Sequence, residues 1–507
     1  MSDTPAGLFL GQSDEGQDQA LLFHRANRHG VVAGATGTGK TVTLQILAQG
    51  FSDAGVPVFC ADVKGDLSGI SQIGTPNEKL LARAADMGLA LTPSAAPTVF
   101  WDLYGQKGHP IRTTVSEIGP VLMARMLDLN EVQEGVLTVV FHVADQEGLL
   151  LLDIDDLRSL LAYVGENAER IGREVGHVAP ASIAAVQRAI LQLEQQGGAA
   201  FFGEPALKLE DVIRVGLDGR GQVNVLDSTR LMNSPRLYAA FLLWLLSELF
   251  EQLPEVGDPE KPRLVFFFDE AHLLFNDAPR ALLEKVEQVV RLIRSKGVGV
   301  YFVTQNPADI PDSVLAQLGN RIQHALRAYT PSEQKGLKAA AQSFRPNPAF
   351  DTAEAIQALG VGEALVSVLD DKGAPTVVAR TRIRPPASRL GPATEAERAA
   401  VIAASPVQGR YEPVLDRESA EEVLAARHAA VERQAQAQAN SKPQGRVKRE
   451  AGADQDRDGD GVRSAPRKRT SNRQTPMEAL TKSVLRTAGS TLTRELLRGV
   501  LGSLRRR

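Results

Sequence analysis

The segment that decides the fold reads Gly30-Val31-Val32-Ala33-Gly34-Ala35-Thr36-Gly37-Thr38-Gly39-Lys40-Thr41. A short apolar strand leads into a glycine-rich turn with the spacing G-x-x-x-x-G-K-[ST], and a helical pattern follows from Thr41 to Phe51. Glycine in such a turn lets successive backbone N–H groups point at one anion, and the helix N-terminus adds its positive dipole. The segment therefore predicts a phosphate-binding loop at Gly34–Thr41.

Two residues of the loop are candidates for binding phosphate and Mg²⁺. We expect Lys40 to reach the β and γ phosphates of a nucleotide and Thr41 to place its hydroxyl on Mg²⁺, a cation that prefers oxygen ligands. A plain glycine turn is the structural alternative, but the strand before the loop and the helix after it favour phosphate binding. ATP is preferred over GTP because the sequence lacks an Asn-Lys-x-Asp motif for reading guanine.

A second segment supplies carboxylates. The apolar run Leu264–Phe268 ends in Asp269 and Glu270, as a buried strand with two acids at its carboxyl end would. We predict that Asp269 lies on the metal side and that Glu270 polarises the attacking water as a general base. Two solvated turn residues are the alternative. Together with the phosphate loop, the pair favours hydrolysis over binding alone.

Three further side chains are candidates for the same site. The strand predicted at Gly299–Thr304 ends in Gln305, whose amide could contact the γ phosphate or its water, although a turn glutamine fits the pattern too. Phosphoryl transfer gains from an arginine that reaches the developing charge, often from a neighbouring subunit. We select Arg321 for this role from Arg321, Arg327, Arg291 and Arg294, each of which also fits a surface charge. Lys64 could face the site or the adjacent subunit.

Bulk composition is that of an ordinary globular protein. The 507 residues are 43% hydrophobic and 23% charged, and the net charge of −4 gives no overall attraction to nucleic acid. The single cysteine, Cys60, excludes an internal disulfide. We see no signal peptide and expect a cytoplasmic protein. The apolar segment Leu237–Ser247 is too short to cross a bilayer, so we predict no transmembrane segment.

Apolar periodicity predicts an α/β fold with one mostly parallel sheet, a helical insertion and a C-terminal helical tail. Residues 441–475 are charged and almost free of large apolar side chains, which favours a disordered linker. The basic helix that follows could contact an acidic membrane surface, nucleic acid, a neighbouring subunit or its own protein. The expected parts are the nucleotide-binding core in two pieces, 1–104 and 204–390, the helical insertion 105–203, a peripheral helical segment 391–440, the linker 441–475 and a basic amphipathic helix 476–507.

Beyond these motifs the chain resembles a known family. The segments Asp62-Val-Lys64-Gly65-Asp66-Leu67-Ser68-Gly69, Leu231-Met-Asn-Ser-Pro-Arg-Leu-Tyr238, Phe266-Phe-Phe-Asp-Glu-Ala-His-Leu-Leu-Phe275 and Arg294-Ser-Lys-Gly-Val-Gly299 are similar to the bacterial HerA-like helicase family of the HerA/FtsK group. The resemblance spans about Gly7 to Pro392. It implies a RecA-like P-loop ATPase core and a homo-oligomer, a hexameric ring that moves double-stranded DNA. Archaeal HerA proteins also carry an N-terminal β-barrel that engages a nuclease, and only 33 residues precede Gly34 here, so nuclease coupling is not expected.

Two functions from different classes follow. The first is an ATP-hydrolysing ring motor, a DNA translocase or helicase. The second is an ATP-dependent assembly or interaction protein that acts on a protein partner or a membrane surface. The acidic net charge, the helical insertion and the basic C-terminal helix favour the second.

Overall fold

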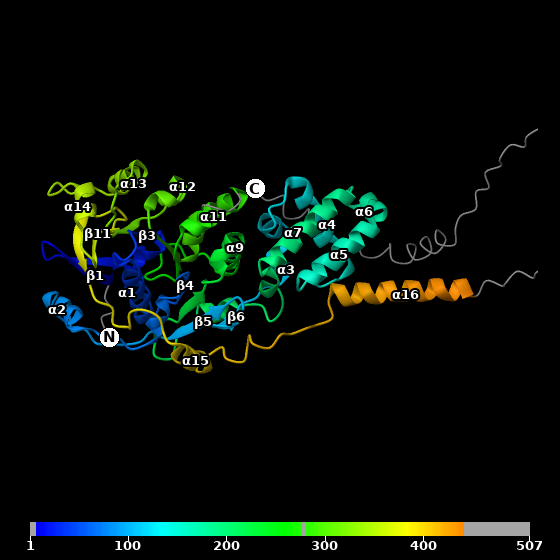
Figure 1. Cartoon of the computed structure of the whole chain (residues 1–507), viewed down its shortest axis with the longest axis horizontal. Helices are drawn as coiled ribbons and strands as arrows, with labels where there is room; N and C mark the ends of the chain where they lie inside the picture. Colours follow the sequence, from blue (N-terminus) through cyan, green and yellow to red (C-terminus); the bar gives the residue numbers. More distant parts are fainter. Residues whose placement is uncertain (1–6, 276–279, 441–507) are drawn as a thin grey trace, which may run out of the picture. The chain divides into compact units, whose positions relative to one another are not determined.

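A single twelve-stranded sheet organises residues 7–275 and 280–440, which the computed structural model describes (Figure 1). The strand order is β2-β1-β12-β11-β10-β3-β9-β8-β4-β7-β5-β6. In this order, each strand from β10 to β6 is parallel to its neighbour. Each strand from β2 to β10 is antiparallel to its neighbour. The strands are β1 Gly7–Ser13, β2 Asp18–Leu22, β3 Gly30–Ala33, β4 Val58–Asp62, β5 Thr98–Asp102, β6 His109–Pro110, β7 Val223–Asp227, β8 Leu264–Phe268, β9 Val298–Thr304, β10 Asn320–Gln323, β11 Glu363–Ser367 and β12 Ala379–Ile383.

Helices pack against both faces of the parallel strands. Because side chains alternate along a strand, β8 sends Val265 and Phe267 to one apolar cluster and Phe266 and Phe268 to the other. The first cluster includes α1, which follows the phosphate loop, and the second includes α9 and α11. The helices of the core are α1 Lys40–Asp53, α2 Glu78–Asp86, α8 Leu209–Val212, α9 Pro235–Gln252, α10 His272–Phe275, α11 Arg280–Ile293, α12 Asp312–Leu315, α13 Pro331–Gln342 and α14 Thr352–Ala358.

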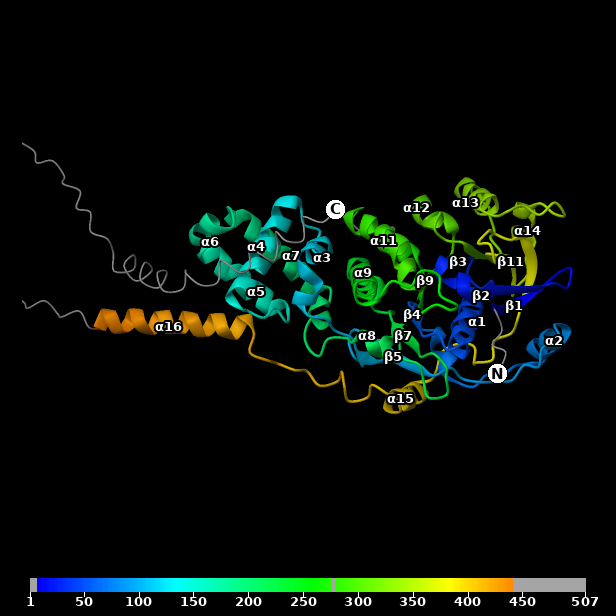
Figure 2. The same ribbon diagram turned by 180° about the vertical axis from the view of Figure 1, so that it is seen from behind.

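Five helices occupy the stretch predicted as an insertion: α3 Val115–Met126, α4 Glu131–Glu147, α5 Ile154–Glu166, α6 Ala168–Glu174 and α7 Pro180–Gln195. Figure 2 shows α4 to α7 gathered together. Capping boxes at Thr114, Asn130 and Asp153 start three of these helices, since each cap side chain accepts a backbone N–H of the first turn. Their buried side chains belong to the same apolar cluster as α9, so this stretch shares its core with the sheet.

The last described elements are α15 Glu395–Ala403 and α16 Ala420–Asn440, and most side chains of α16 are exposed. The predicted linker at 441–475 and the basic helix at 476–507 lie outside the described residues. The domain boundaries stay a prediction. Within the described ranges, no helix combines the length and apolarity needed to span a bilayer.

The expected α/β fold with a mostly parallel sheet is confirmed. The strands predicted at Leu264–Phe268 and Gly299–Thr304 correspond to β8 and β9. The strands on either side of α1 are not neighbours, however, because β9 and β8 lie between β3 and β4. Strand pairing of this kind depends on residues far apart in the chain, so local periodicity does not reveal it.

Phe267 tests how much the central strand contributes to stability. Its side chain is fully buried, with ring centroids 5.3 Å from Tyr301 and 6.4 Å from Phe51. Phe267→Ala should lower the free energy of unfolding by about 3–5 kcal/mol, through lost burial and the cavity left behind. Urea unfolding followed by circular dichroism measures this. The exposed Val431 on α16 provides the control, because Val431→Ala should shift stability by less than about 0.5 kcal/mol.

Candidate active site

The phosphate loop has the backbone that its glycines predict. Gly34, Gly37 and Gly39 have φ of 151°, 77° and 114°, values that side chains with a Cβ rarely adopt. A Cβ at Gly34 would also lie 2.5 Å from the Cβ of His324. The loop is fixed from both flanks, since Gly34 N donates to Thr304 O at 3.2 Å and its neighbour Ala35 donates to Ala325 O at 2.8 Å. Residues 34–41 therefore form a preorganised turn.

His324 supports the loop from β10. Its Nε2 lies 2.9 Å from the Thr43 hydroxyl on α1, and its Nδ1 lies 2.8 Å from Glu363 O. Burial, with a smaller contribution from the nearby Lys40, lowers its pKa to about 4, so the ring is neutral at pH 7. A neutral imidazole ties α1 to β11 without adding charge behind the loop.

Lys40 lies within the loop that it is predicted to serve. Its ammonium donates to Gly34 O at 2.6 Å and to Ala35 O at 3.1 Å. Burial, followed by repulsion from Lys64, lowers the pKa of Lys40. An anion at the loop would offset both effects, so the site favours a phosphate.

A loop after β4 brings further polar groups to the same edge of the sheet. The Asp62 carboxylate accepts the backbone N–H of Gly65 at 2.8 Å and that of Leu67 at 3.1 Å, which fixes this loop. The loop then presents Lys64 and Asp66. The Thr41 hydroxyl, the predicted Mg²⁺ ligand, lies 3.4 Å from the Asp66 carboxylate.

Asp269 sits at the end of β8 and is 8% exposed. Burial, then repulsion from Asp62 and Glu270, raises its pKa to about 8. Asp62 behaves similarly, because burial and repulsion from Asp66 raise its pKa to about 7. A cation at this edge would relieve the repulsion, and oxygen groups are the ligands that Mg²⁺ prefers.

These residues fit Mg²⁺ on the chemistry of their donor groups. No group of three or more His, Cys, Asp or Glu side chains in the described ranges is placed to hold a metal ion by itself. The predicted ligands Thr41 and Asp269 would therefore share the ion with phosphate oxygens and water, as Mg²⁺ sites in nucleotide-binding proteins usually do.

Glu270 is contacted by three polar side chains. Its carboxylate forms an ion pair with Lys64, accepts Gln305 Nε2 at 3.2 Å, and lies 3.1 Å from His272 Nδ1. Burial alone would raise the pKa of Glu270, but the Lys64 pair and the Gln305 hydrogen bond outweigh it and the pKa is lowered. Glu270 is therefore an anion at pH 7, as a general base must be. Its φ of 48° is unusual for a residue other than glycine.

Gln305 connects Glu270 to the phosphate loop. While Nε2 donates to Glu270, Oε1 lies 3.5 Å from the Thr36 hydroxyl. The structure thus brings Lys40, Thr41, Asp269, Glu270 and Gln305 to one edge of the sheet, where β3, β8 and β9 end. Their individual roles stay predictions.

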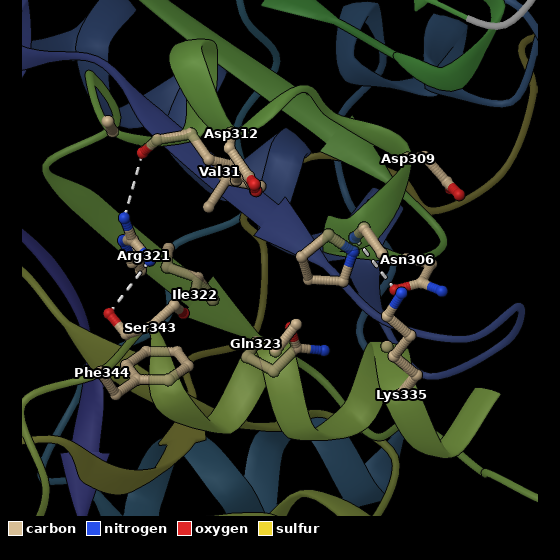
Figure 3. A pocket seen from close by; sticks show the side chains of 16 residues that line it. Val31, Asn306, Asp309, Asp312, Arg321, Ile322, Gln323, Lys335, Ser343 and Phe344 are labelled. Carbon is tan, nitrogen blue, oxygen red and sulfur yellow. Dashed lines mark hydrogen bonds between the residues drawn. The ribbon is translucent and has the colours of Figure 1, made fainter. Parts of the chain in front are cut away.

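Arg321 does not join this group. Its side chain lines a separate cavity of about 750 Å³ with Asn306, Asp309 and Lys335, and the lining contains none of the residues Gly34 to Thr41 (Figure 3). The guanidinium donates to Leu315 O and Ser343 O at 3.0 Å and to Leu318 O at 3.1 Å. A role in a neighbouring subunit would require these bonds to break, and it stays a prediction.

Sequence reasoning gave Asp62, Asp66 and His324 no chemical role. Asp62 and Asp66 carried a signal, since Asp62 ends a buried strand, Asp66 follows it, and parallel strands place their carboxyl ends at one edge. His324 carried none. It follows β10, a four-residue strand that periodicity did not predict, and only the pairing of β10 with β3 places it behind the loop.

The parallel sheet, the phosphate loop at the end of β3 and the two acids at the end of β8 define a P-loop ATPase with a RecA-like core. The model of the family described as "Helicase HerA-like C-terminal" matches residues 8–507. The chain belongs to this family.

Individual relatives are distant. The DNA double-strand break repair helicase HerA of Sulfolobus acidocaldarius is 21% identical over 371 residues, which cover 72% of this chain and 66% of that protein, just under two thirds of its length. Among solved structures, VirB4 of Thermoanaerobacter pseudethanolicus is 15% identical with a TM-score of 0.49, covering 75% of this chain and 97% of that one. The plasmid coupling protein TrwB in complex with ADP and Mg²⁺ is 15% identical with a TM-score of 0.49, covering 76% and 98%.

The ion pair between Lys64 and Glu270 yields a prediction. Lys64→Met keeps the length of the side chain but removes the charge that positions Glu270, so kcat for ATP hydrolysis should fall by about tenfold or more. Binding of a non-hydrolysable ATP analogue should stay within about threefold, because Lys64 contacts Glu270 and not the loop. Lys64→Arg should restore part of kcat. An unchanged kcat in Lys64→Met would show that the pair has no role in turnover.

Proposed function

We propose that this protein is a ring motor that hydrolyses ATP with Mg²⁺ and uses the energy to move along double-stranded DNA. The observation that carries the hydrolytic part is the Glu270 carboxylate, which is ionised and joined through Gln305 to the phosphate loop. A protein that only binds nucleotide has no need of a base in this position.

Different residues of the site bind the phosphates, bind Mg²⁺ and accept the proton. Backbone N–H groups of residues 34–41 and the start of α1 bind the β and γ phosphates, and Lys40 adds charge. Thr41 and Asp269 would hold Mg²⁺, which would supply positive charge to offset the negative charge that develops on the phosphate. Glu270 accepts the proton of the attacking water, while Gln305 and Lys64 hold the carboxylate in position.

Family membership supports DNA as the track, as does the printed function of the Sulfolobus acidocaldarius relative, a DNA double-strand break repair helicase. The net charge of −4 means that DNA would have to meet a local basic surface or the lumen of a ring. The resemblance to the HerA/FtsK group implies a ring, so a homo-oligomer, a hexameric ring, is part of the proposal.

Two substitutions separate binding from chemistry. Glu270→Gln should keep ATP binding within a few-fold and lower kcat by about 10²-fold or more, because it removes the base and leaves the loop intact. Lys40→Ala should weaken binding as well, since it removes the cation inside the loop. Calorimetric binding of a non-hydrolysable analogue and steady-state phosphate release measure the two effects. Full turnover by Glu270→Gln would exclude Glu270 as the base.

The polymer on which the motor moves is tested by measuring the rate of ATP hydrolysis by the protein. The rate is measured without nucleic acid and with double-stranded DNA, single-stranded DNA or RNA, each at two salt concentrations. A DNA motor should be stimulated by duplex DNA, and the stimulation should weaken with salt because phosphate contacts release counterions. Hydrolysis that is indifferent to all three polymers would favour the other function, an ATP-dependent assembly protein that acts on a protein partner or a membrane surface.

A further inference from the structure

The phosphate loop has two different flanks. On one flank Thr36 contacts Gln305, which leads to the base Glu270. On the other flank Gly362 N donates to Thr38 O at 3.2 Å, and a Cβ on Gly39 would meet Gly362 at 3.4 Å. The γ phosphate belongs beside Glu270, because that is where water attacks it. The nucleoside end of the bound nucleotide must then extend toward the flank at Gly362.

A cavity of about 420 Å³ opens on this second flank. It begins at Gly39 and Val42, the last glycine of the loop and the second residue after Lys40. It extends between α2 and the segment from Ile383 to Leu390, which begins at the end of β12. Its apolar walls come from Val42, Leu80, Val361, Ile383, Pro385 and Leu390. A cavity of this size, open to the loop, has room for a nucleobase with its ribose.

The side chain of Arg83 lines this cavity. Arg83 on α2 donates to Gly362 O at 3.3 Å and to Val361 O at 3.4 Å. Gly362 has a φ of 78°, and a Cβ there would lie 2.2 Å from Arg83 Nη1, so the guanidinium lies directly against this turn. A planar guanidinium beside aliphatic walls can stack on the face of an aromatic ring.

The polar character of the lining favours adenine among the bases. Among the described residues that line the cavity are Lys79, Arg83 and Arg384, and none of these lining residues carries a carboxylate. Guanine presents N–H donors on its pairing edge and is usually read by an acidic side chain, whereas adenine can be held by stacking and by backbone groups. Cations without a carboxylate also suit a ligand that carries phosphates.

We propose that this cavity is the nucleobase site, that α2 forms its outer wall, and that Arg83 stacks on the adenine. The inference rests on the proposed function, because it takes the loop at residues 34–41 to hold the triphosphate. Arg83 then contributes to affinity for the nucleobase, and it is supplied by α2, a helix between β4 and β5 that contains none of the phosphate-loop residues.

The test compares two ligands by isothermal titration calorimetry with Mg²⁺: a non-hydrolysable ATP analogue, and inorganic tripolyphosphate, which has no base. Arg83→Ala should weaken the ATP analogue by about fivefold or more, the worth of one stacking cation, and leave tripolyphosphate unchanged. Leu390→Trp, which fills the cavity from a residue that is 44% exposed, should do the same. The matched control is Arg173→Ala on α6, whose side chain is 81% exposed and which should change neither ligand.

The outcomes separate this inference from the proposed function. Loss of affinity for the ATP analogue, with tripolyphosphate unchanged, supports the nucleobase site. If Arg83→Ala and Leu390→Trp leave both ligands unchanged, or weaken both equally, the nucleobase site is wrong while the phosphate loop stands. If neither ligand binds the wild-type protein, the proposed function fails and this inference falls with it.

Discussion

Buried carboxylates at one edge of an apolar sheet are the constraint on which the rest of the site depends. Strands β4, β5 and β7 end in Asp62, Asp102 and Asp227, and β8 is followed by Asp269. Removing a carboxylate from water is costly unless hydrogen bonds or cations compensate. Asp62 and Asp102 accept backbone N–H groups of the loops that follow them, and Asp227 has Lys107 and Arg398 within 3.4 Å. Asp269 has no such hydrogen bond or ion pair among the described residues, and burial with repulsion from Asp62 and Glu270 raises its pKa.

The chemistry proposed for this protein lies at the part of this edge around Asp269 and Glu270. Lys40 and Lys64 lie near it. Lys64 forms an ion pair with the Glu270 carboxylate, and Lys40 donates to a backbone carbonyl of the phosphate loop. Glu270 keeps its left-handed backbone because its carboxylate is bonded on several sides, and strained residues of this kind persist where surrounding contacts determine them. A nucleotide with Mg²⁺ would complete the balance of charge.

The helical stretch at 105–203 is physically connected to this edge. Helix α3 packs against α9. Tyr238 on α9 is fully buried and donates its hydroxyl to the backbone O of Asp269 at 3.4 Å. Since the side chains of α3 to α7 share one apolar cluster with α9, a partner bound to these helices would act on a surface that is continuous with the support of Asp269.

The sequence by itself determined the parts that local chemistry encodes. The phosphate loop, the helix after it, the acids at Asp269 and Glu270 and most parallel strands follow from glycine spacing and apolar periodicity over a few residues. Tertiary structure alone decided which strands are neighbours, with β9 and β8 between β3 and β4. It also decided that Lys64 pairs with Glu270, that His324 supports the loop and that Arg321 bonds to three carbonyls elsewhere. These contacts join residues from separate elements, and most of them are distant in the chain, so no local pattern carries them.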